Sequence, residues 1–401
     1  MKHQQHRLYF LDWVRILAFM LLVVYHVGMY YVSWDWHVKS PFASDAIEPL
    51  MLLSSPWRLG LLFLVAGVAS RFLIIKLGGL RFLRQRSVRL LVPLIFGMFV
   101  IVPPQAYFEV VEKVAYQGGY GDFMRLYVSA YPGFCRAKEG CLDMPTWNHL
   151  WFVAYLWVYT LVLGALVLGL GARFERLAQA VTAPLSGWKL IALPAALLAL
   201  IRLLLLQHFP TTHGLTDDWY NHAQYLTLFV LGAMMALDRP VWARLEAVRW
   251  YALAVALTCW AALVSYYSLP EAITMEPALH AWRLLMRAVY ALCGWCAIVA
   301  VCGFAHRHLN RDNAQRRYLT EAVFPVYILH QSLIVTLAHW LKSAGIAPAT
   351  EGLMLIVLTL CISFGVFELV RRSALLRPLF GLEWRGWAAQ RTTRSDGAAA
   401  A

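Results

Sequence analysis

Residues 9–31 read YFLDWVRILAFMLLVVYHVGMYY, an apolar run long enough to cross a membrane as one helix. Two side chains in this run, Arg15 and His26, are costly to place in hydrocarbon. They lie eleven residues apart, which at about 100° per residue puts both on one face of a helix, roughly 16 Å apart along its axis. An ionisable residue inside a membrane helix is a candidate functional residue by default. The run therefore predicts a membrane-spanning helix with one functional face.

The composition of the whole chain is that of a helical membrane protein. Hydrophobic residues make up 61% of the 401 residues and charged residues 14%, against about 25% charged in soluble domains. The net charge of +13 falls in short segments between apolar runs, so it indicates membrane topology rather than nucleic-acid binding. The predicted fold class is all-α, a polytopic membrane protein with about ten transmembrane helices. The expected spans are 9–31, 57–76, 90–108, 148–170, 189–207, 221–237, 250–268, 281–304, 319–341 and 352–370.

The basic residues also predict an orientation. Of the 35 Lys and Arg residues, 23 fall in the segments on the side of the termini and 6 in the opposite loops. Because basic residues are retained inside, both termini are expected in the cytoplasm. The first span lacks a small-residue cleavage site and is interpreted as an uncleaved anchor. We expect one transmembrane domain over residues 1–385 and a disordered cytoplasmic tail over 386–401.

The cysteines do not suggest a metal centre. Cys135 and Cys141 lie in the long outer segment 109–147, where a disulfide and two free thiols are both open. Cys293 and Cys296 fall in an apolar span, where small-residue packing is the more common role. The chain has no H-E-x-x-H and no paired C-x-x-C, so no metal site is expected, and no Walker-type phosphate loop, which argues against an ATP-driven pump.

The first span contains the strongest candidates for chemistry. Asp12 and Arg15 are three residues apart and near enough to pair on a helix; otherwise Arg15 would extend to the cytoplasmic surface. His26 can take or give a proton near neutral pH, although a lone histidine on an apolar face is often a packing residue. His330 in the ninth span and Arg71 in the second are further ionisable groups at membrane depth.

A group of arginines follows the second span. Residues 81–93 read RFLRQRSVRLLVP and are expected to form a loop at the cytoplasmic mouth of the third span. Guanidinium groups bind phosphates in bidentate fashion, so Arg84, Arg86 and Arg89 would suit a phosphorylated donor such as an acyl-coenzyme A. Topological positive charge and contact with lipid headgroups explain the same residues.

These motifs together resemble the acyltransferase-3 family of integral membrane O-acyltransferases. The first-span signature of that family, Asp-x-x-Arg followed by ten residues and a His, is met by Asp12, Arg15 and His26. Further matches are an arginine pair before a proline, His-Leu-Trp-Phe in the fourth span and Tyr-x-x-His in the ninth, at Arg86, Arg89, Pro93, His149–Phe152, Tyr327 and His330. The stretch Trp36–Ser40 resembles the periplasmic glucan succinyltransferase branch. Where the family often has Ser-Gly in the second span, this chain has Ala66–Gly67.

The resemblance implies an activity and a set of roles. An acetyl or succinyl group would pass from cytoplasmic acyl-coenzyme A, a co-substrate, to a hydroxyl of an extracytoplasmic glycan or other polyhydroxy acceptor. His26 would deprotonate that hydroxyl or carry the acyl group itself, Asp12 would orient Arg15, and Arg15 would stabilise negative charge. His330 would be a second catalytic residue. Arg84, Arg86 and Arg89 would bind coenzyme A phosphates, and the substrate-binding residues would be His149, Trp151, Arg71 and Tyr327.

Two other classes of function are compatible with buried ions. A proton-coupled transporter or exporter also carries intramembrane His and Arg residues, but the chain shows no inverted repeat. A membrane scaffold without chemistry would not need two ionisable groups on one helix face. The expected location is the bacterial inner membrane, with the lipid bilayer as a partner, no nucleic acid, and a homo-oligomer compatible with the sequence.

Overall fold

The computed structural model describes residues 8–136 and 140–384. The regular elements of this part of the chain are helices and one two-stranded antiparallel sheet, β1 (Cys135–Arg136) and β2 (Gly140–Cys141). The predicted tail 386–401 lies outside the described residues. The all-α polytopic fold class is confirmed.

Seven helical segments of the described chain are long and apolar enough to cross a membrane, or up to eight if one bent pair forms a single span. Two more helices, α9 (Lys189–Leu205) and α10 (Trp219–Met235), have 17 residues each, the short end of the range that spans a bilayer. The count of ten and the cytoplasmic termini stay predictions. The seven segments are Tyr9–Tyr31, Glu48–Leu77, Asn148–Leu170, Arg239–Tyr267, Pro277–His308, Ala314–Ala344 and Pro348–Arg372.

The chain divides into two compact units, each assembled from separate stretches of sequence. The first unit comprises residues 1–20, 47–84 and 158–317, and the second comprises 21–46, 85–157 and 318–401. The helices α1 (Tyr9–Tyr31), α4 (Gly79–Phe96), α7 (Trp151–Leu170) and α14 (Ala314–Leu341) contain residues of both units. The single domain over 1–385 stays a prediction.

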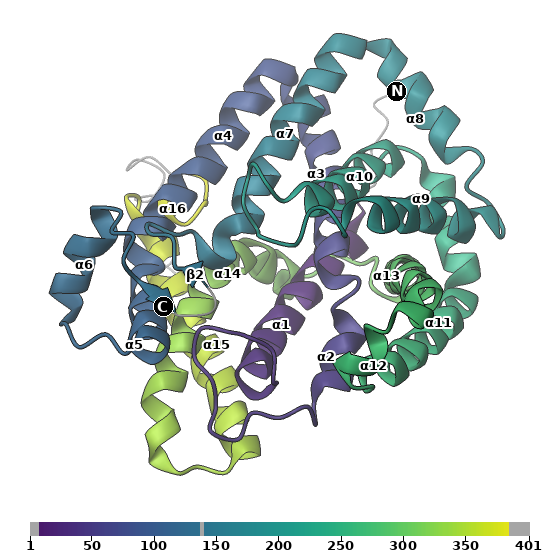
Figure 1. Cartoon of the computed structure of the whole chain (residues 1–401). Coiled ribbons are helices and arrows are strands. Elements are labelled where there is room, and N and C mark those ends of the chain that lie inside the picture. The colour runs from purple at the N-terminus through teal and green to yellow at the C-terminus, as the bar shows by residue number, and fades with distance from the viewer. Residues whose placement is uncertain (1–7, 137–139, 385–401) are drawn as a thin grey trace. The chain divides into compact units, whose positions relative to one another are not determined.

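The first unit packs long helices through small residues. Helices α11 and α13 run side by side, as do α3 and α10 (Figure 1). A Cβ at Gly67 on α3 would overlap the backbone carbonyl of Phe229, and one at Gly232 on α10 would overlap that of Leu64. Small residues permit such close backbone approach between membrane helices. Besides α9 and α10, the helices of this unit are α2 (Glu48–Ser54), α3 (Arg58–Leu77), α8 (Ala172–Thr182), α11 (Arg239–Tyr267), α12 (Glu271–Thr274), η3 (Pro277–Leu279) and α13 (His280–His308).

The second unit is built around the C-terminal half of α1. Val23, Val27 and Tyr30 of α1 belong to a buried cluster with residues of α5, α14 and α15, which lie close together in Figure 1. The disulfide Cys135–Cys141 closes the β1–β2 hairpin. The second unit also contains η1 (Gly97–Ile101), α5 (Pro103–Val114), α6 (Tyr120–Val128), η2 (Asn148–Leu150), η4 (Lys342–Ala344), α15 (Pro348–Arg372) and α16 (Leu376–Leu379).

The segment after α1 folds back onto the end of that helix. Ser40 and Ser44 donate backbone hydrogen bonds to the carbonyls of Tyr30 and Tyr31, at 3.0 and 2.9 Å. The Lys39 ammonium donates to the carbonyl oxygens of Met29 and Trp34, at 2.8 and 2.9 Å, and to that of Val32. The last carbonyls of a helix lack intrahelical partners and carry partial negative charge, so a cation there stabilises the end. This cap fixes the position of residues 32–40.

A bend separates α4 from α5. The π-helical turn η1 follows α4, and the axis turns by 43° before Pro103 begins α5. Wide turns and prolines are common causes of such kinks. Helix α5 therefore begins in the predicted third span 90–108 and runs into the predicted outer segment 109–147, which also contains α6.

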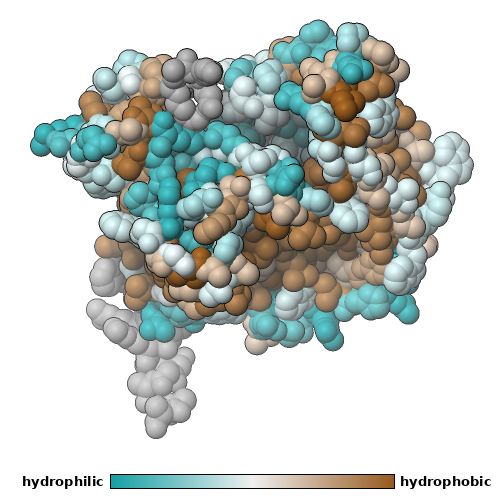
Figure 2. Space-filling model, turned by 60° about the horizontal axis from the view of Figure 1, so that its bottom comes forward, coloured by the Kyte–Doolittle hydropathy of each residue, from teal (hydrophilic) through white to brown (hydrophobic). Residues whose placement is uncertain are grey.

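Large apolar side chains are exposed on both units, among them Leu197 and Leu200 on α9 and Leu353 and Leu369 on α15. Figure 2 shows wide hydrophobic areas on the visible face of the molecule. Exposed apolar helix surfaces of this extent fit a bilayer rather than water.

The close approach of α3 and α10 predicts an asymmetry between glycine variants. Gly232→Ala should lower the melting temperature of the detergent-solubilised protein, because overpacking costs roughly 1–3 kcal/mol. Gly365→Ala on α15, where a Cβ meets no atom within 4 Å, should leave it unchanged or raise it. Equal melting temperatures for the two variants would contradict the close contact.

Candidate functional site

Two histidines of the second unit form a direct pair. Nδ1 of His26 on α1 lies 2.8 Å from Nε2 of His330 on α14, and the rings are nearly parallel with centroids 5.0 Å apart. His330 is buried at 1% exposure, whereas His26 is partly buried. The structure thus brings together the two histidines that the sequence singled out in different spans.

The neighbours of the pair fix which nitrogens carry protons. Nδ1 of His330 lies 2.5 Å from the backbone carbonyl of Tyr327, which can only accept, so this nitrogen donates. Nε2 of a neutral His330 is then an acceptor, and Nδ1 of His26 must donate to it. The lone pair of a neutral His26 therefore resides on Nε2. A basic nitrogen held by a second imidazole is suited to take a proton or to attack a carbonyl carbon.

A third histidine lies against the pair. The ring of His149 meets that of His330 edge-on, with centroids 5.2 Å apart, and its Nε2 donates to the carbonyl of Ile328 at 3.0 Å. Within the described residues Nδ1 of His149 is buried without a hydrogen-bond partner. The hydroxyl of Tyr327 donates to the carbonyl of His149 at 2.5 Å. Tyr327 therefore hydrogen-bonds to both His330 and His149. Nδ1 of His149 remains available as a hydrogen-bond acceptor.

Two tryptophans flank this group in different ways. Trp36 stacks over His26, with ring centroids 6.4 Å apart. Trp151 is 8% exposed and packs edge-on against Tyr155 at 4.9 Å. Trp36 thus contacts the catalytic candidate His26, and the substrate-binding role of Trp151 stays a prediction.

A second polar cluster in the same unit was not predicted as a site. Nδ1 of His37 lies 2.5 Å from a carboxylate oxygen of Glu109 on α5. Its Nε2 lies 2.9 Å from the amide nitrogen of Gln105 and 3.0 Å from that of Gln331. Lys113 pairs with Glu109 at 3.1 Å. The sequence signal was the four-residue spacing of Gln105, Glu109 and Lys113, which puts them on one side of a helix.

In the first unit, Asp12 is shared between two arginines. The predicted contact with Arg15 is present at 3.8 Å, but Arg316 on α14 is the closer partner. Arg316 is 2% exposed and also pairs with Asp312 at 2.7 Å. Hydrogen bonds from Arg317 and Arg316 hold the pKa of Asp312 well below its usual range. Sequence reasoning missed Arg316 because it lies some 300 residues from Asp12.

Arg15 lines a cavity of about 590 Å³ in the first unit. The polar residues of its wall are Asp12, Arg15 and Lys76, and the other lining residues are apolar side chains of α1, α3 and residue 8. A mostly apolar cavity with a few polar groups is the usual form of a small-molecule site. Arg15 therefore faces a space that can accept a ligand.

Arg71 does not line this cavity. It is 6% exposed, pairs with Glu175 of α8 and lies over the ring of Phe174, 5.0 Å from its centroid. These contacts compensate its charge within the unit. The substrate-binding role of Arg71 stays a prediction.

The loop predicted for residues 81–93, which contains the arginines after the second span, is a helix in the structure. Gly78, with φ of 79°, ends α3, and the helix α4 begins at the next residue, so these arginines lie on a helix. On such a helix Arg86 and Arg89 share one side, whereas Arg84 points about 160° away from Arg86. Arg89 donates to the carbonyl of Gly381 at 2.8 Å. The three predicted phosphate ligands therefore do not form one cluster.

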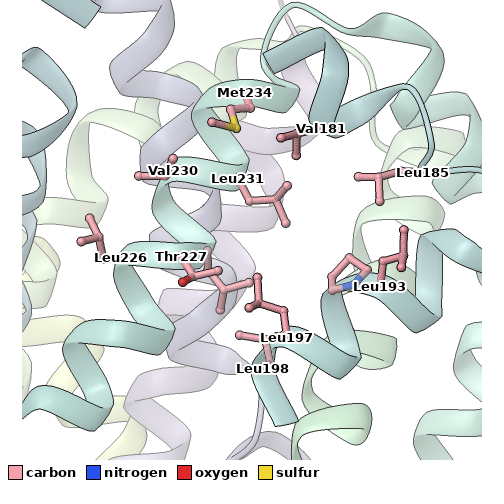
Figure 3. A pocket seen from close by; sticks show the side chains of 12 residues that line it. Val181, Leu185, Leu193, Leu197, Leu198, Leu226, Thr227, Val230, Leu231 and Met234 are labelled. Carbon is pink, nitrogen blue, oxygen red and sulfur yellow. The ribbon is translucent and has the colours of Figure 1, made fainter. Parts of the chain in front are cut away.

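A further cavity, of about 460 Å³, lies in the first unit. Leu193 and Leu197 on α9 and Leu231 on α10 face each other across it (Figure 3). No titratable side chain lines it, so the candidate chemistry belongs to the histidines and to Arg15. Within residues 8–136 and 140–384 no three His, Cys, Asp or Glu residues are grouped as metal ligands.

Comparison with known proteins agrees with these features. The family model of acyltransferase-3, described as an acyltransferase domain, matches residues 8–368. Glucans biosynthesis protein C of Salmonella paratyphi B is 22% identical over 388 residues, which cover 93% of this chain and 94% of that protein. Its counterpart in Salmonella heidelberg is 23% identical over 386 residues, with the same coverage. No solved structure matches. The chain is a multi-pass membrane acyltransferase that belongs to the acyltransferase-3 family.

Proposed function

We propose that this protein transfers an acetyl or succinyl group from cytoplasmic acyl-coenzyme A to a hydroxyl of an extracytoplasmic glycan, with periplasmic glucan as the leading acceptor. The observation that carries the proposal is the His26–His330 pair at 2.8 Å, in which His26 is also the histidine of the family's first-span signature. The proposed location is the bacterial inner membrane.

The chemistry of O-acyl transfer fits the tautomer of His26. An acceptor hydroxyl is a weak nucleophile and must lose its proton as the new ester bond forms. Nε2 of His26 carries the lone pair, and the hydrogen bond through His330 to the carbonyl of Tyr327 keeps the ring oriented. His26 can therefore act as general base or carry the acyl group, with His330 as the residue that positions it.

The donor side of the proposal rests on the cavity at Arg15. Its apolar walls suit the acyl and pantetheine parts of a thioester, while Arg15 and Lys76 supply positive charge for an anionic donor. Asp12 and Arg316 hold this end of α1 in place through their ion pair. Arg86 and Arg89, on one side of α4, are proposed to contact the phosphates.

The acceptor side rests on His149 and on the relatives. The buried Nδ1 of His149 can accept a hydrogen bond from a substrate hydroxyl or amide. The relatives named for glucan biosynthesis cover nearly the whole chain, which supports a glucan acceptor. Identification of the ester formed on the glucan distinguishes an acetyl from a succinyl group.

His26→Ala should remove acyl transfer while leaving the protein folded. Loss of a general base or nucleophile costs typically 10²–10⁴-fold in rate. The measurement is release of coenzyme A thiol from acetyl- and succinyl-coenzyme A by membranes with matched amounts of protein and added glucan. Val24→Ala, at an exposed position of the same helix, is the control and should retain activity. Activity of His26→Ala equal to the control would contradict the role of His26, and no thiol release by the parent would favour a transporter.

The arginines of α4 should differ in their effect on donor binding. Arg86→Gln should weaken the binding of acyl-coenzyme A about tenfold or more, because a hydrogen bond to a charged group contributes about 1.5–3 kcal/mol. Arg84→Gln, on the other side of the helix and exposed, should leave the affinity near that of the parent. Isothermal titration of the purified protein with acyl-coenzyme A measures both. Equal affinities for the two variants would leave only the topological role of these arginines.

A further inference from the structure

The cluster around His37 has the form of a second imidazole–carboxylate base. The imidazole and the Glu109 carboxylate are 2.5 Å apart, and the side chains are 16% and 9% exposed, respectively. A carboxylate that accepts Nδ1–H fixes the tautomer of the ring and stabilises the imidazolium when the ring takes a proton. The arrangement therefore leaves Nε2 of His37 as the basic nitrogen.

The side chains around Nε2 of His37 can accommodate both the neutral and the protonated imidazole. The hydroxyl of Ser332 donates to the side-chain oxygen Oε1 of Gln105 at 3.4 Å, which turns the side-chain nitrogen Nε2 of Gln105 toward His37. Gln331 presents its amide nitrogen to the same atom. Amide groups can donate through nitrogen or accept through oxygen, so Gln331 can serve the neutral and the protonated ring. A substrate hydroxyl can replace one of these two donors.

The cluster lies beside the catalytic candidates. Trp36 stacks on His26 and contacts the ring of His37 with centroids 5.5 Å apart. Gln331 and Ser332 follow His330 directly along α14. His37 comes after the end of α1, and the shared contact with Trp36 places it beside His26.

We propose that His37, held by Glu109, is the general base for the acceptor hydroxyl, and that His26 carries the acyl group. This inference rests on the proposed function. In the first step Nε2 of His26 bonds to the thioester carbon, and the sulfur leaves with the electron pair as thiolate. The Nδ1 proton of His26 passes to Nε2 of His330.

In the second step the acceptor oxygen bonds to the acyl carbon as the hydroxyl proton moves to Nε2 of His37. The carbon–nitrogen bond breaks, its electron pair returns to Nε2 of His26, and His330 returns the proton to Nδ1. His37 then releases its proton to water, and the coenzyme A thiolate takes one from water. The division of labour separates a donor half-reaction at His26 from an acceptor half-reaction at His37.

The two half-reactions can be measured separately in full-length protein reconstituted in nanodiscs. The first is exchange of labelled coenzyme A into acetyl- or succinyl-coenzyme A without acceptor, and the second is acylation of added glucan. His37→Gln should retain exchange within about twofold and lose glucan acylation by about 100-fold or more. Glu109→Gln, which keeps the shape of the side chain, should also retain exchange and lose acylation by at least about tenfold.

The matched control is Glu112→Gln. Glu112 pairs with His339 at 2.8 Å and with Lys342, and lies less than one turn along α5 from Glu109. This variant should retain both activities. Acylation by His37→Gln near the parent rate, loss of exchange together with acylation, or acylation by the parent without exchange would each overturn the inference while leaving the acyltransferase activity established. A parent that catalyses neither reaction would overturn the proposed function itself.

Discussion

The constraint on which this structure depends is the cost of placing polar groups at membrane depth. A buried charge is tolerated only with a partner, and a buried neutral donor or acceptor requires a hydrogen bond. The chain meets this requirement differently at the two ends of α1. Near its start Asp12, Arg316 and Asp312 form ion pairs. Toward its end His26 and His330 form a chain of neutral hydrogen bonds that finishes on a backbone carbonyl.

This difference has chemical consequences. A guanidinium that lines a mostly apolar cavity, as that of Arg15 does, can attract an anionic ligand. Neutral imidazoles in contact are better suited to moving a proton, since neither position requires a fixed charge. One helix can therefore carry a cation near its start and a proton-transfer group about three turns further along.

The sequence predicted the features that depend on local pattern. Apolar runs predicted the seven segments that are long and apolar enough to cross a membrane, and the spacing of Arg15 and His26 predicted that they share one face of α1. The motif resemblance indicated that His330 belongs with His26, and the structure shows their contact. Through-space partners such as Arg316 could not be predicted, because no periodicity links residues some 300 positions apart. The loop predicted for residues 81–93 was wrong, because these residues continue as a helix after Gly78.

The position of His37 shows why that residue was the hardest to predict. It lies in a segment without regular structure, where no helical period assigns a side chain to a face. Its position depends on Lys39, whose ammonium binds the carbonyl of Met29 at the end of α1 and those of Val32 and Trp34 just after it, and so holds the segment at the helix terminus. In the sequence the same lysine counts as one of few basic residues on the predicted outer side, and the Trp36–Ser40 stretch that contains it gave no sign of the cap. A charge that the topology rule treats as an exception thus holds the second histidine beside the first.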